Sequence, residues 1–231
     1  MKVLIGTSGY SYKEWKGSFY PEDLPASRML AYYAERLGTV EANSTFYRLP
    51  TPKALADWSH ATPAGFVFAI KAPQRITHQL RLVGCEEPLA RLAAATETLG
   101  PKRGPVLFQL PPNFKKDAAR LTAFLGGVPR DLRAAFEFRH ESWFTDEVYD
   151  ALRARGAALV LSESETLAAP VVATADWGYL RLRREDYVSA DLARWAETIR
   201  QQPWSEAFVY FKHEDGARGP KLAGELAALL R

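Results

Sequence analysis

The chain has 231 residues, of which 47% are hydrophobic and 25% are charged, and its formal net charge at pH 7 is +3. This length and apolar content suit one large α/β domain, and the small net charge argues against a dedicated nucleic-acid-binding protein. The single cysteine, Cys85, excludes an internal disulfide bond and a thiolate metal cage.

The distribution of apolar residues predicts a protein without a membrane segment. The N-terminal MKVLIGTSGY holds a short apolar stretch that Gly and Ser interrupt, so it does not resemble a signal peptide. No uninterrupted apolar run reaches the length of about 18 residues that a membrane-spanning helix needs. We therefore expect a soluble protein with no membrane partner, and the single cysteine suits a reducing, cytoplasmic setting.

Short apolar runs recur along the whole chain and are predicted to be β-strands. They occupy residues 3–8, 39–46, 66–71, 105–110, 133–138, 157–162, 178–183 and 206–211. Helix-like segments are found at residues 27–37, 86–100, 142–156, 189–200 and 219–230. Residues 164–177 show no helix pattern, so the sixth crossover is predicted to be irregular. This succession is typical of an α/β fold with one (β/α)8 TIM-type barrel over residues 1–231.

Polar residues end several of these strands, and the alternation of side chains along a strand predicts where they point. In residues 133–138, Phe136 and Phe138 share one face, which we assign to the helix layer. Glu137 and Arg139 then face the barrel axis. The same alternation places further polar side chains on the axis: Glu41, Lys71, Gln109 and Arg181. Because barrel enzymes carry their active sites at the C-terminal ends of the strands, we predict that these residues line one cavity there.

Two inward carboxylates are the candidates for catalysis. Glu41 and Glu137 belong to strands that lie across the barrel mouth from each other, so they could act as a general acid and base. With His140 they could also hold a divalent ion. The alternative is that each glutamate only neutralises an arginine in a structural network.

Cofactor motifs are scarce. The sequence has neither a Walker pattern nor GxGxxG, so no nucleotide cofactor is indicated. It also has no HxH or HExxH spacing, so the only candidate ligands for a divalent metal are the inward glutamates and His140. His78 and His213, which follow the third and eighth strands, are further groups that could shuttle protons.

Basic residues near the strand ends predict an anionic ligand. The set comprises Arg48, Lys71, Arg75, Arg139, Arg181 and Lys212. A guanidinium fork binds carboxylate or phosphate with two hydrogen bonds. Arg139 and Arg181, which are inward, are the strongest members, whereas Arg48 and Arg75 also suit a role as helix caps or surface charges.

Uncharged residues of the first loops complete the candidate binding set. Gln109 and Asn43 share the inward face and could orient a ligand by hydrogen bonds. Tyr10 and Tyr47 lie in the loops after the first two strands, where a barrel builds the walls of its substrate site. They could stack on a base or a sugar ring, or they could pack the N-terminal loop against the helices.

Five segments resemble the signature blocks of a known family. They are GTSGYSYKEWKGSFYP (6–21), TVEANSTFYRLP (39–50), FVFAIKAPQRITH (66–78), PVLFQLPPNF (105–114) and FEFRHESW (136–143). These segments are similar to those of the YecE-like proteins, a family also called domain of unknown function 72. The resemblance implies a (β/α)8-type barrel and implies no particular reaction.

Three functions fit these observations. The first is an enzyme, a hydrolase, lyase or isomerase, that acts on a small anionic or phosphorylated metabolite by carboxylate acid/base chemistry. The second is a barrel that processes or binds nucleic acid, with the aromatic and basic residues gripping a strand. The third is a ligand-binding barrel without catalysis. The modest net charge favours the first function, and the sequence predicts no particular oligomeric state.

Overall fold

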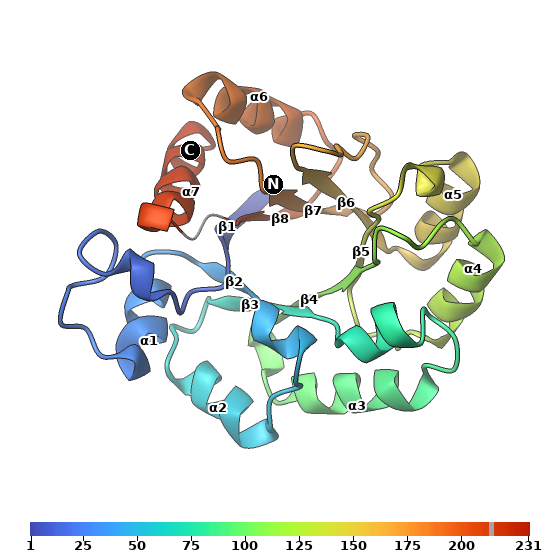
Figure 1. The fold of residues 1–231 in the computed structure, drawn as a ribbon, viewed down its shortest axis with the longest axis horizontal. Coiled ribbons are helices and arrows are strands. Elements are labelled where there is room, and N and C mark those ends of the chain that lie inside the picture. The colour runs from blue at the N-terminus through green and yellow to red at the C-terminus, as the bar shows by residue number, and fades with distance from the viewer. Residues whose placement is uncertain (213–214) are drawn as a thin grey trace.

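Parallel strands close into a barrel with helices outside it (Figure 1). The computed structural model describes residues 1–212 and 215–231, and within them eight strands pair in chain order from β1 to β8, with β8 returning to β1. The strands are β1 (Lys2–Ser8), β2 (Thr39–Ala42), β3 (Val67–Lys71), β4 (Arg103–Gln109), β5 (Ala134–Glu137), β6 (Ala158–Glu163), β7 (Trp177–Leu182) and β8 (Glu206–Phe211). The predicted TIM-type barrel is confirmed.

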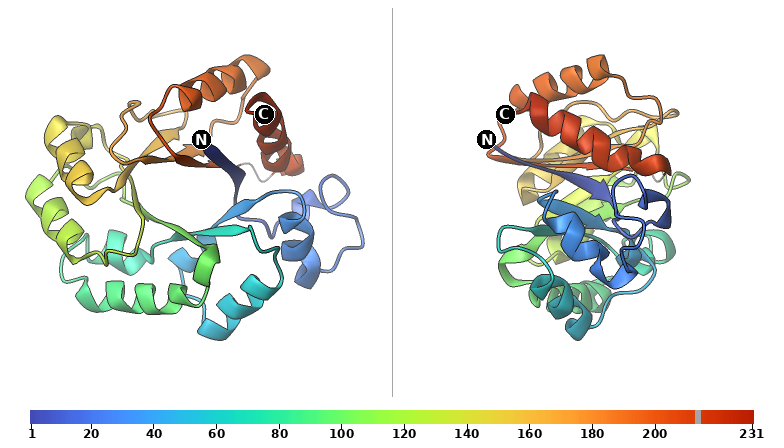
Figure 2. Two further views of the ribbon diagram at one scale, coloured as in Figure 1. Left: turned by 180° about the vertical axis from the view of Figure 1, so that it is seen from behind. Right: turned by 90° about the vertical axis from the view of Figure 1, so that its left-hand side faces the viewer.

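The helices form a ring around the strands (Figure 1). They are α1 (Met29–Ala34), α2 (Pro52–His60), α3 (Glu86–Glu97), α4 (Ala118–Gly127), α5 (Asp146–Arg155), α6 (Ser189–Arg200) and α7 (Arg218–Leu229). The segment between β6 and β7 has no helix among its residues, all of which the structure describes, so the irregular sixth crossover is confirmed. Helix α7 packs against β1 and β8, beside the N-terminus (Figure 2).

Two helices, α2 and α4, lie where the sequence analysis named none. Helix α2 begins after Thr51, whose hydroxyl accepts a hydrogen bond from the amide of Ala54, and Pro52 occupies its first position. Helix α4 begins after Asp117, whose carboxylate accepts from the amide of Arg120. An N-cap residue followed by proline or by a short apolar pattern was therefore the sequence signal that could have predicted these two helices.

Strand β2 is shorter than the predicted run of residues 39–46. It ends at Ala42, and Asn43–Phe46 forms a 3-10 turn. The hydroxyl of Thr45 lies 2.7 Å from the carbonyl oxygen of Ala42 and 2.6 Å from that of Lys71. This side chain therefore ties the turn to the end of β3, which brings the loop after β2 close to Lys71.

The predicted alternation of faces along the strands is confirmed. Phe108 and Phe136 stack outside the barrel with ring centroids 5.2 Å apart, in the cluster that the helices cover. The barrel interior is a separate cluster, formed mainly by Leu4, Ala69, Leu107, Ala135, Val160, Tyr179, Phe208 and Tyr210. The interior is thus filled with side chains, and the polar inward residues lie at its C-terminal end.

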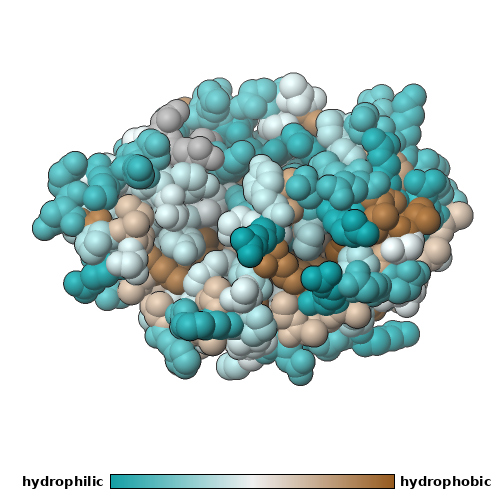
Figure 3. All heavy atoms as spheres, turned by 60° about the horizontal axis from the view of Figure 1, so that its bottom comes forward, coloured by the Kyte–Doolittle hydropathy of each residue, from teal (hydrophilic) through white to brown (hydrophobic). Residues whose placement is uncertain are grey.

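One face of the molecule is largely polar (Figure 3). The face in Figure 3 is mostly hydrophilic, and its apolar side chains gather in small areas between hydrophilic ones. Within the two described stretches, no helix has both the length and the apolar character that a membrane crossing requires.

Candidate functional site

Arg181, near the end of β7, links two glutamates across the barrel and is only 2% exposed. Its Nε donates to Oε2 of Glu41 at 2.9 Å, and its Nη2 donates to Oε1 of the same carboxylate at 2.8 Å. Its Nη1 donates to Oε2 of Glu137 at 2.5 Å. One guanidinium therefore joins β7 to both β2 and β5, with the bidentate geometry that makes arginine–carboxylate pairs strong.

The remaining contacts of Glu41 occupy both of its oxygens. The hydroxyl of Ser8 donates to Oε1 at 2.7 Å, and the strand register places Ser8 directly beside Glu41. The hydroxyl of Tyr179 donates to Oε2 at 2.6 Å. Glu41 is fully buried, and each of its oxygens receives one hydrogen bond from Arg181 and one from a hydroxyl.

Glu137 differs from Glu41 because one of its oxygens is free. Its Oε2 accepts from Nε2 of Gln109 at 2.9 Å as well as from Arg181, and the register pairs Gln109 with Glu137. Among the described residues, its Oε1 has no hydrogen-bond partner, and Nη2 of Arg183 lies 3.6 Å away.

The charges around Glu137 determine its protonation. Burial alone raises the pKa of this carboxyl, but the charges of Arg181 and Arg183 and the hydrogen bonds from Gln109 and Arg181 lower it to about 2. Glu137 is therefore ionised at neutral pH. Its Oε1 is buried and accepts no hydrogen bond from another described residue.

Lys71, at the end of β3, is an inward residue whose ammonium group has a lowered pKa. It is partly buried, and its Nζ lies 4.4 Å from the ring centroid of Phe46. Burial, followed by the charge of Arg181, lowers the pKa of Lys71 to about 8, although Glu41 and Glu137 oppose this shift. In the part of the chain that the structure describes, Lys71 makes no ion pair.

Arg139 and Arg183 follow the ends of β5 and β7, respectively. Both line a cavity of about 70 Å³ that also receives the side chains of Ser162, Ser164 and Thr166. Arg139 has no carboxylate partner within residues 1–212 and 215–231. The mouth therefore carries basic groups in excess of the acids that face them.

The structure does not bring His140 into a metal site with the two glutamates. Its Nδ1 accepts a hydrogen bond from the amide of Ser142 at 3.1 Å, which caps the 3-10 turn Glu141–Trp143. No group of three or more His, Cys, Asp or Glu side chains among the described residues has the geometry to hold a metal ion. His213, the other candidate after β8, lies outside the described residues.

Four further candidate residues occupy different surroundings. Tyr10 packs on Tyr33 with ring centroids 6.2 Å apart, within the aromatic cluster of the first loop. Tyr47 is 76% exposed, and Lys212 is exposed directly after β8. Asn43 has a buried Oδ1 with no hydrogen-bond partner among the described residues.

Several residues of this site are not among the predicted site residues. Ser8 and Ser162 end inward faces of β1 and β6, and Tyr179 and Arg183 flank Arg181 on the inward face of β7. The same alternation of side chains that identified Arg181 could have identified all of them. What it could not show is which pairs meet across the barrel.

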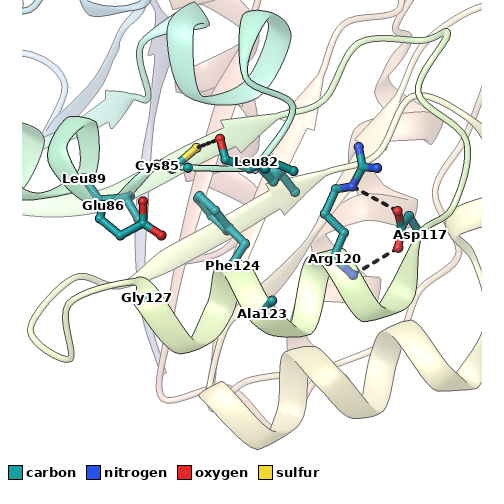
Figure 4. Close-up of a pocket in the computed structure, with 11 residues that line it drawn as sticks. Leu82, Cys85, Glu86, Leu89, Asp117, Arg120, Ala123, Phe124 and Gly127 are labelled. Atoms are coloured by element: carbon teal, nitrogen blue, oxygen red, sulfur yellow. Dashed lines mark hydrogen bonds and ion pairs between the residues drawn. The ribbon is translucent and has the colours of Figure 1, made fainter.

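A second pocket lies outside the barrel between α3 and α4 (Figure 4). It has a volume of about 390 Å³ and a mostly apolar lining that includes Cys85 and Phe124. The charged pair in its wall, Asp117 and Arg120, point toward each other with 2.9 Å between the nearest atoms. Burial raises the pKa of Cys85 to about 11, so its thiol stays protonated and unreactive at neutral pH. With its charged pair engaged and its thiol protonated, this pocket is a weaker candidate for a reactive site than the barrel mouth.

Comparison with known proteins identifies relatives. A family model described as "Protein of unknown function DUF72" matches residues 4–231. The chain is 30% identical over 143 residues to the UPF0759 protein YecE of Escherichia coli (strain K12) and 29% identical over 156 residues to the UPF0759 protein YunF of Bacillus subtilis (strain 168). These matches cover 62% and 64% of this chain but 50% and 54% of the relatives, so the chain spans about half the length of the curated relatives it matches.

A solved structure is similar over the whole chain. The crystal structure of a DUF72 family protein from Thermotoga maritima has a TM-score of 0.90 and 27% sequence identity. The similarity covers 100% of this chain and 99% of that protein.

Proposed function

The chain belongs to the DUF72 family, and from the side chains at its barrel mouth we propose that it is an enzyme acting on a small anionic metabolite. One observation carries the proposal: Lys71 and Arg139 lie at strand ends without a carboxylate partner among the described residues, while Arg181 and Arg183 are the cations that pair with the buried glutamates. Unpaired cations at the mouth of a barrel attract and hold a carboxylate or a phosphate.

Lys71 is the group that we assign to proton transfer. Its pKa of about 8 is the closest to neutral pH among the inward residues with a resolved shift, and proton transfer is most efficient from such a group. Glu137, ionised and with Oε1 free, would accept a hydrogen bond from a hydroxyl of the substrate. This pair suits an isomerase, a lyase or a hydrolase that moves a proton on its substrate.

Glu41 receives a positioning role in this proposal. Both of its oxygens are occupied by donors from Ser8, Tyr179 and Arg181, so it has no acceptor to offer to a substrate. It holds Arg181 in place, and Arg181 in turn holds Glu137. The proton-transferring pair is therefore Lys71 with Glu137 rather than Glu41 with Glu137.

A nucleic-acid-binding barrel is the second candidate, and the exposure of Tyr47 favours it. This side chain is 76% exposed in the turn after β2, next to Arg48, which is the combination that stacks on a base and holds a phosphate. The net charge of +3 is small for such a function.

Turnover and binding separate the two candidates. The protein is incubated with phosphorylated and carboxylated metabolites, and turnover is followed by NMR for the parent, Lys71→Met and the control Lys53→Met. Lys53 is exposed on α2 and pairs with Asp57. We expect turnover of one metabolite class that Lys71→Met abolishes and Lys53→Met preserves. Tight binding of a single-stranded oligonucleotide that Tyr47→Ala weakens, with no metabolite turned over, would favour the nucleic-acid barrel instead.

A further inference from the structure

We propose that the cavity between the ends of β5, β6 and β7 is the seat of a phosphate group, so that the substrate is a phosphate monoester. This inference rests on the proposed function and deepens it by naming the class of anion and the residues that hold it. The cavity is lined by Arg139, Arg183, Ser162, Ser164 and Thr166 among others.

The size of the cavity fits a small oxyanion. Its volume of about 70 Å³ is several times what one water needs, ~10–15 Å³ on the same measure. It is far below the ~300–1,000 Å³ of pockets that enclose whole cofactors or drug-sized ligands. A tetrahedral group with the rest of its molecule outside is the ligand that such a space accommodates.

Two arginines enter this space with hydrogen-bond donors to spare. Arg139 has no ion pair within the described residues. Arg183 lies 3.6 Å from Glu137, beyond hydrogen-bond distance, and its Nε is buried without a hydrogen-bond partner among the described residues. Burial of an unpartnered donor costs free energy that an oxyanion would restore. Two guanidinium forks are also the usual means of phosphate recognition.

The charge balance around Arg183 supports an anion. Burial lowers the pKa of Arg183, Glu137 opposes this shift, Arg181 and Arg139 add to it, and Glu41 opposes it more weakly. Arg181 and Arg183 together balance Glu41 and Glu137, so Arg139 adds a positive charge that no lining residue of the cavity balances. Of the described residues that line the cavity, none is acidic.

Hydroxyl groups also line the cavity, and that of Ser162 supplies a neutral donor. Ser162 is 4% exposed near the end of β6, and its hydroxyl makes no hydrogen bond with another described residue. Ser164 holds its loop by accepting from the amide of Leu167 at 3.3 Å and donating to the carbonyl oxygen of the same residue at 3.1 Å, so its proton is already engaged. Thr166 is exposed at the rim. The acids on either side of Ser164 are engaged elsewhere, Glu163 with Trp195 and Glu165 with the amide of Glu185.

The position of the cavity also suits catalysis. Arg183 lines the cavity, and its Nη2 lies 3.6 Å from Oε1 of Glu137, which accepts no hydrogen bond from another described residue. A phosphate held by Arg139 and Arg183 would therefore place the rest of the substrate toward Glu137 and the barrel axis. In this proposal the phosphate group binds the substrate to the protein, and the reaction takes place at the inward residues near the barrel axis.

Phosphate binding tests the inference with inorganic phosphate and glycerol phosphate as probes. Affinities are measured by isothermal titration calorimetry for the parent, Arg139→Met, Arg183→Met and Ser162→Ala. The control is Arg91→Met, because Arg91 is exposed on α3 and pairs with Glu87. We expect each arginine variant to weaken both probes about tenfold, the effect of losing a charge-assisted hydrogen bond, and the control to bind as the parent does. Ser162→Ala removes only a hydroxyl from the cavity and leaves both arginines in place, so it tests the cavity with a variant that should fold even if an arginine variant does not.

The outcomes distinguish this inference from the proposed function. Phosphate binding that survives both arginine variants and is lost in Lys71→Met overturns the phosphate seat and leaves the anionic mouth intact. The absence of phosphate binding by the parent, with carboxylates still bound and turned over, also overturns the seat alone. If the parent binds neither phosphates nor carboxylates, the inference and the proposed function fail together.

Discussion

Arg181 and Glu137 meet across the barrel through a hydrogen bond of 2.5 Å between Nη1 and Oε2, and both side chains are almost fully buried. The same guanidinium holds Glu41 with two more hydrogen bonds. Buried charges are tolerated only when they are paired and hydrogen-bonded, and removing one member leaves its partners uncompensated. The predictions for stability follow from this network.

Replacing Glu137 by glutamine removes the charge that faces Arg181 and Arg183 while keeping the shape of the side chain. We expect the free energy of unfolding to fall by about 3 kcal/mol, as for other buried ion pairs that lose one partner. Urea unfolding of Glu137→Gln is compared with that of Glu147→Gln, because Glu147 is exposed and pairs with Lys116. Equal stability of the two variants would contradict a structural need for the Glu137 charge and would favour a purely functional carboxylate.

Acid should remove the same stabilisation in a defined range. The pKa of Glu137 in the folded protein is about 2, below its ordinary value of 4.5, so its contribution is complete above pH 4.5 and is lost as the pH falls toward 2. The difference corresponds to about 3 kcal/mol at neutral pH. Unfolding is measured between pH 7 and pH 2 for the parent and Glu137→Gln. The parent should lose more stability than the variant over this range, and parallel curves would contradict the assignment.

Lys71 should react as an amine that loses its proton near pH 8. The lowered pKa, about 8 against an ordinary value of 10.5, means that its neutral form is abundant where exposed lysines are still protonated. Competitive acetylation over a range of pH, read by mass spectrometry, gives the midpoint for each lysine. Lys53, which is exposed, serves as the reference. A midpoint for Lys71 equal to that of Lys53 would remove it from proton transfer at neutral pH.

The hydroxyl of Tyr179 should contribute to stability through Glu41. It donates to Oε2 at 2.6 Å inside the filled barrel, so Tyr179→Phe leaves one hydrogen bond to a buried carboxylate unmade. We expect a loss of ~1.5–3 kcal/mol in the free energy of unfolding. Tyr47→Phe is the control, because Tyr47 is 76% exposed and should melt as the parent does. A Tyr179→Phe variant as stable as that control would show that Glu41 is satisfied without this donor.

The inward residues could be predicted from the sequence because a strand alternates its faces with period two. That rule correctly placed Glu137 and Arg181 on the axis, and β8 has the predicted limits of Glu206–Phe211. The predicted length of the strand was wrong at β2, which ends at Ala42. There the hydroxyl of Thr45 donates a hydrogen bond to the carbonyl oxygen of Lys71, and the chain turns. That contact joins residues distant in sequence, and no local pattern reports it.

The pairing of side chains within the site could not be predicted in the same way. Glu41 and Glu137 share a face and a residue type, yet one has both oxygens occupied and the other has one oxygen free. The difference comes from Ser8 and Tyr179, which reach Glu41 from β1 and β7. Such contacts depend on strand order and register, which appear only when the barrel is closed.

The filled interior beneath Arg181 has a kinetic consequence. Leu4, Leu107 and Tyr210 occupy the barrel below the glutamates, so a molecule that arrives at the mouth cannot pass through to the other end. Whatever binds there arrives and departs through one opening. A product that keeps its anionic group must vacate that opening before the next substrate molecule can take its place, so it should compete directly with substrate and slow turnover as it accumulates.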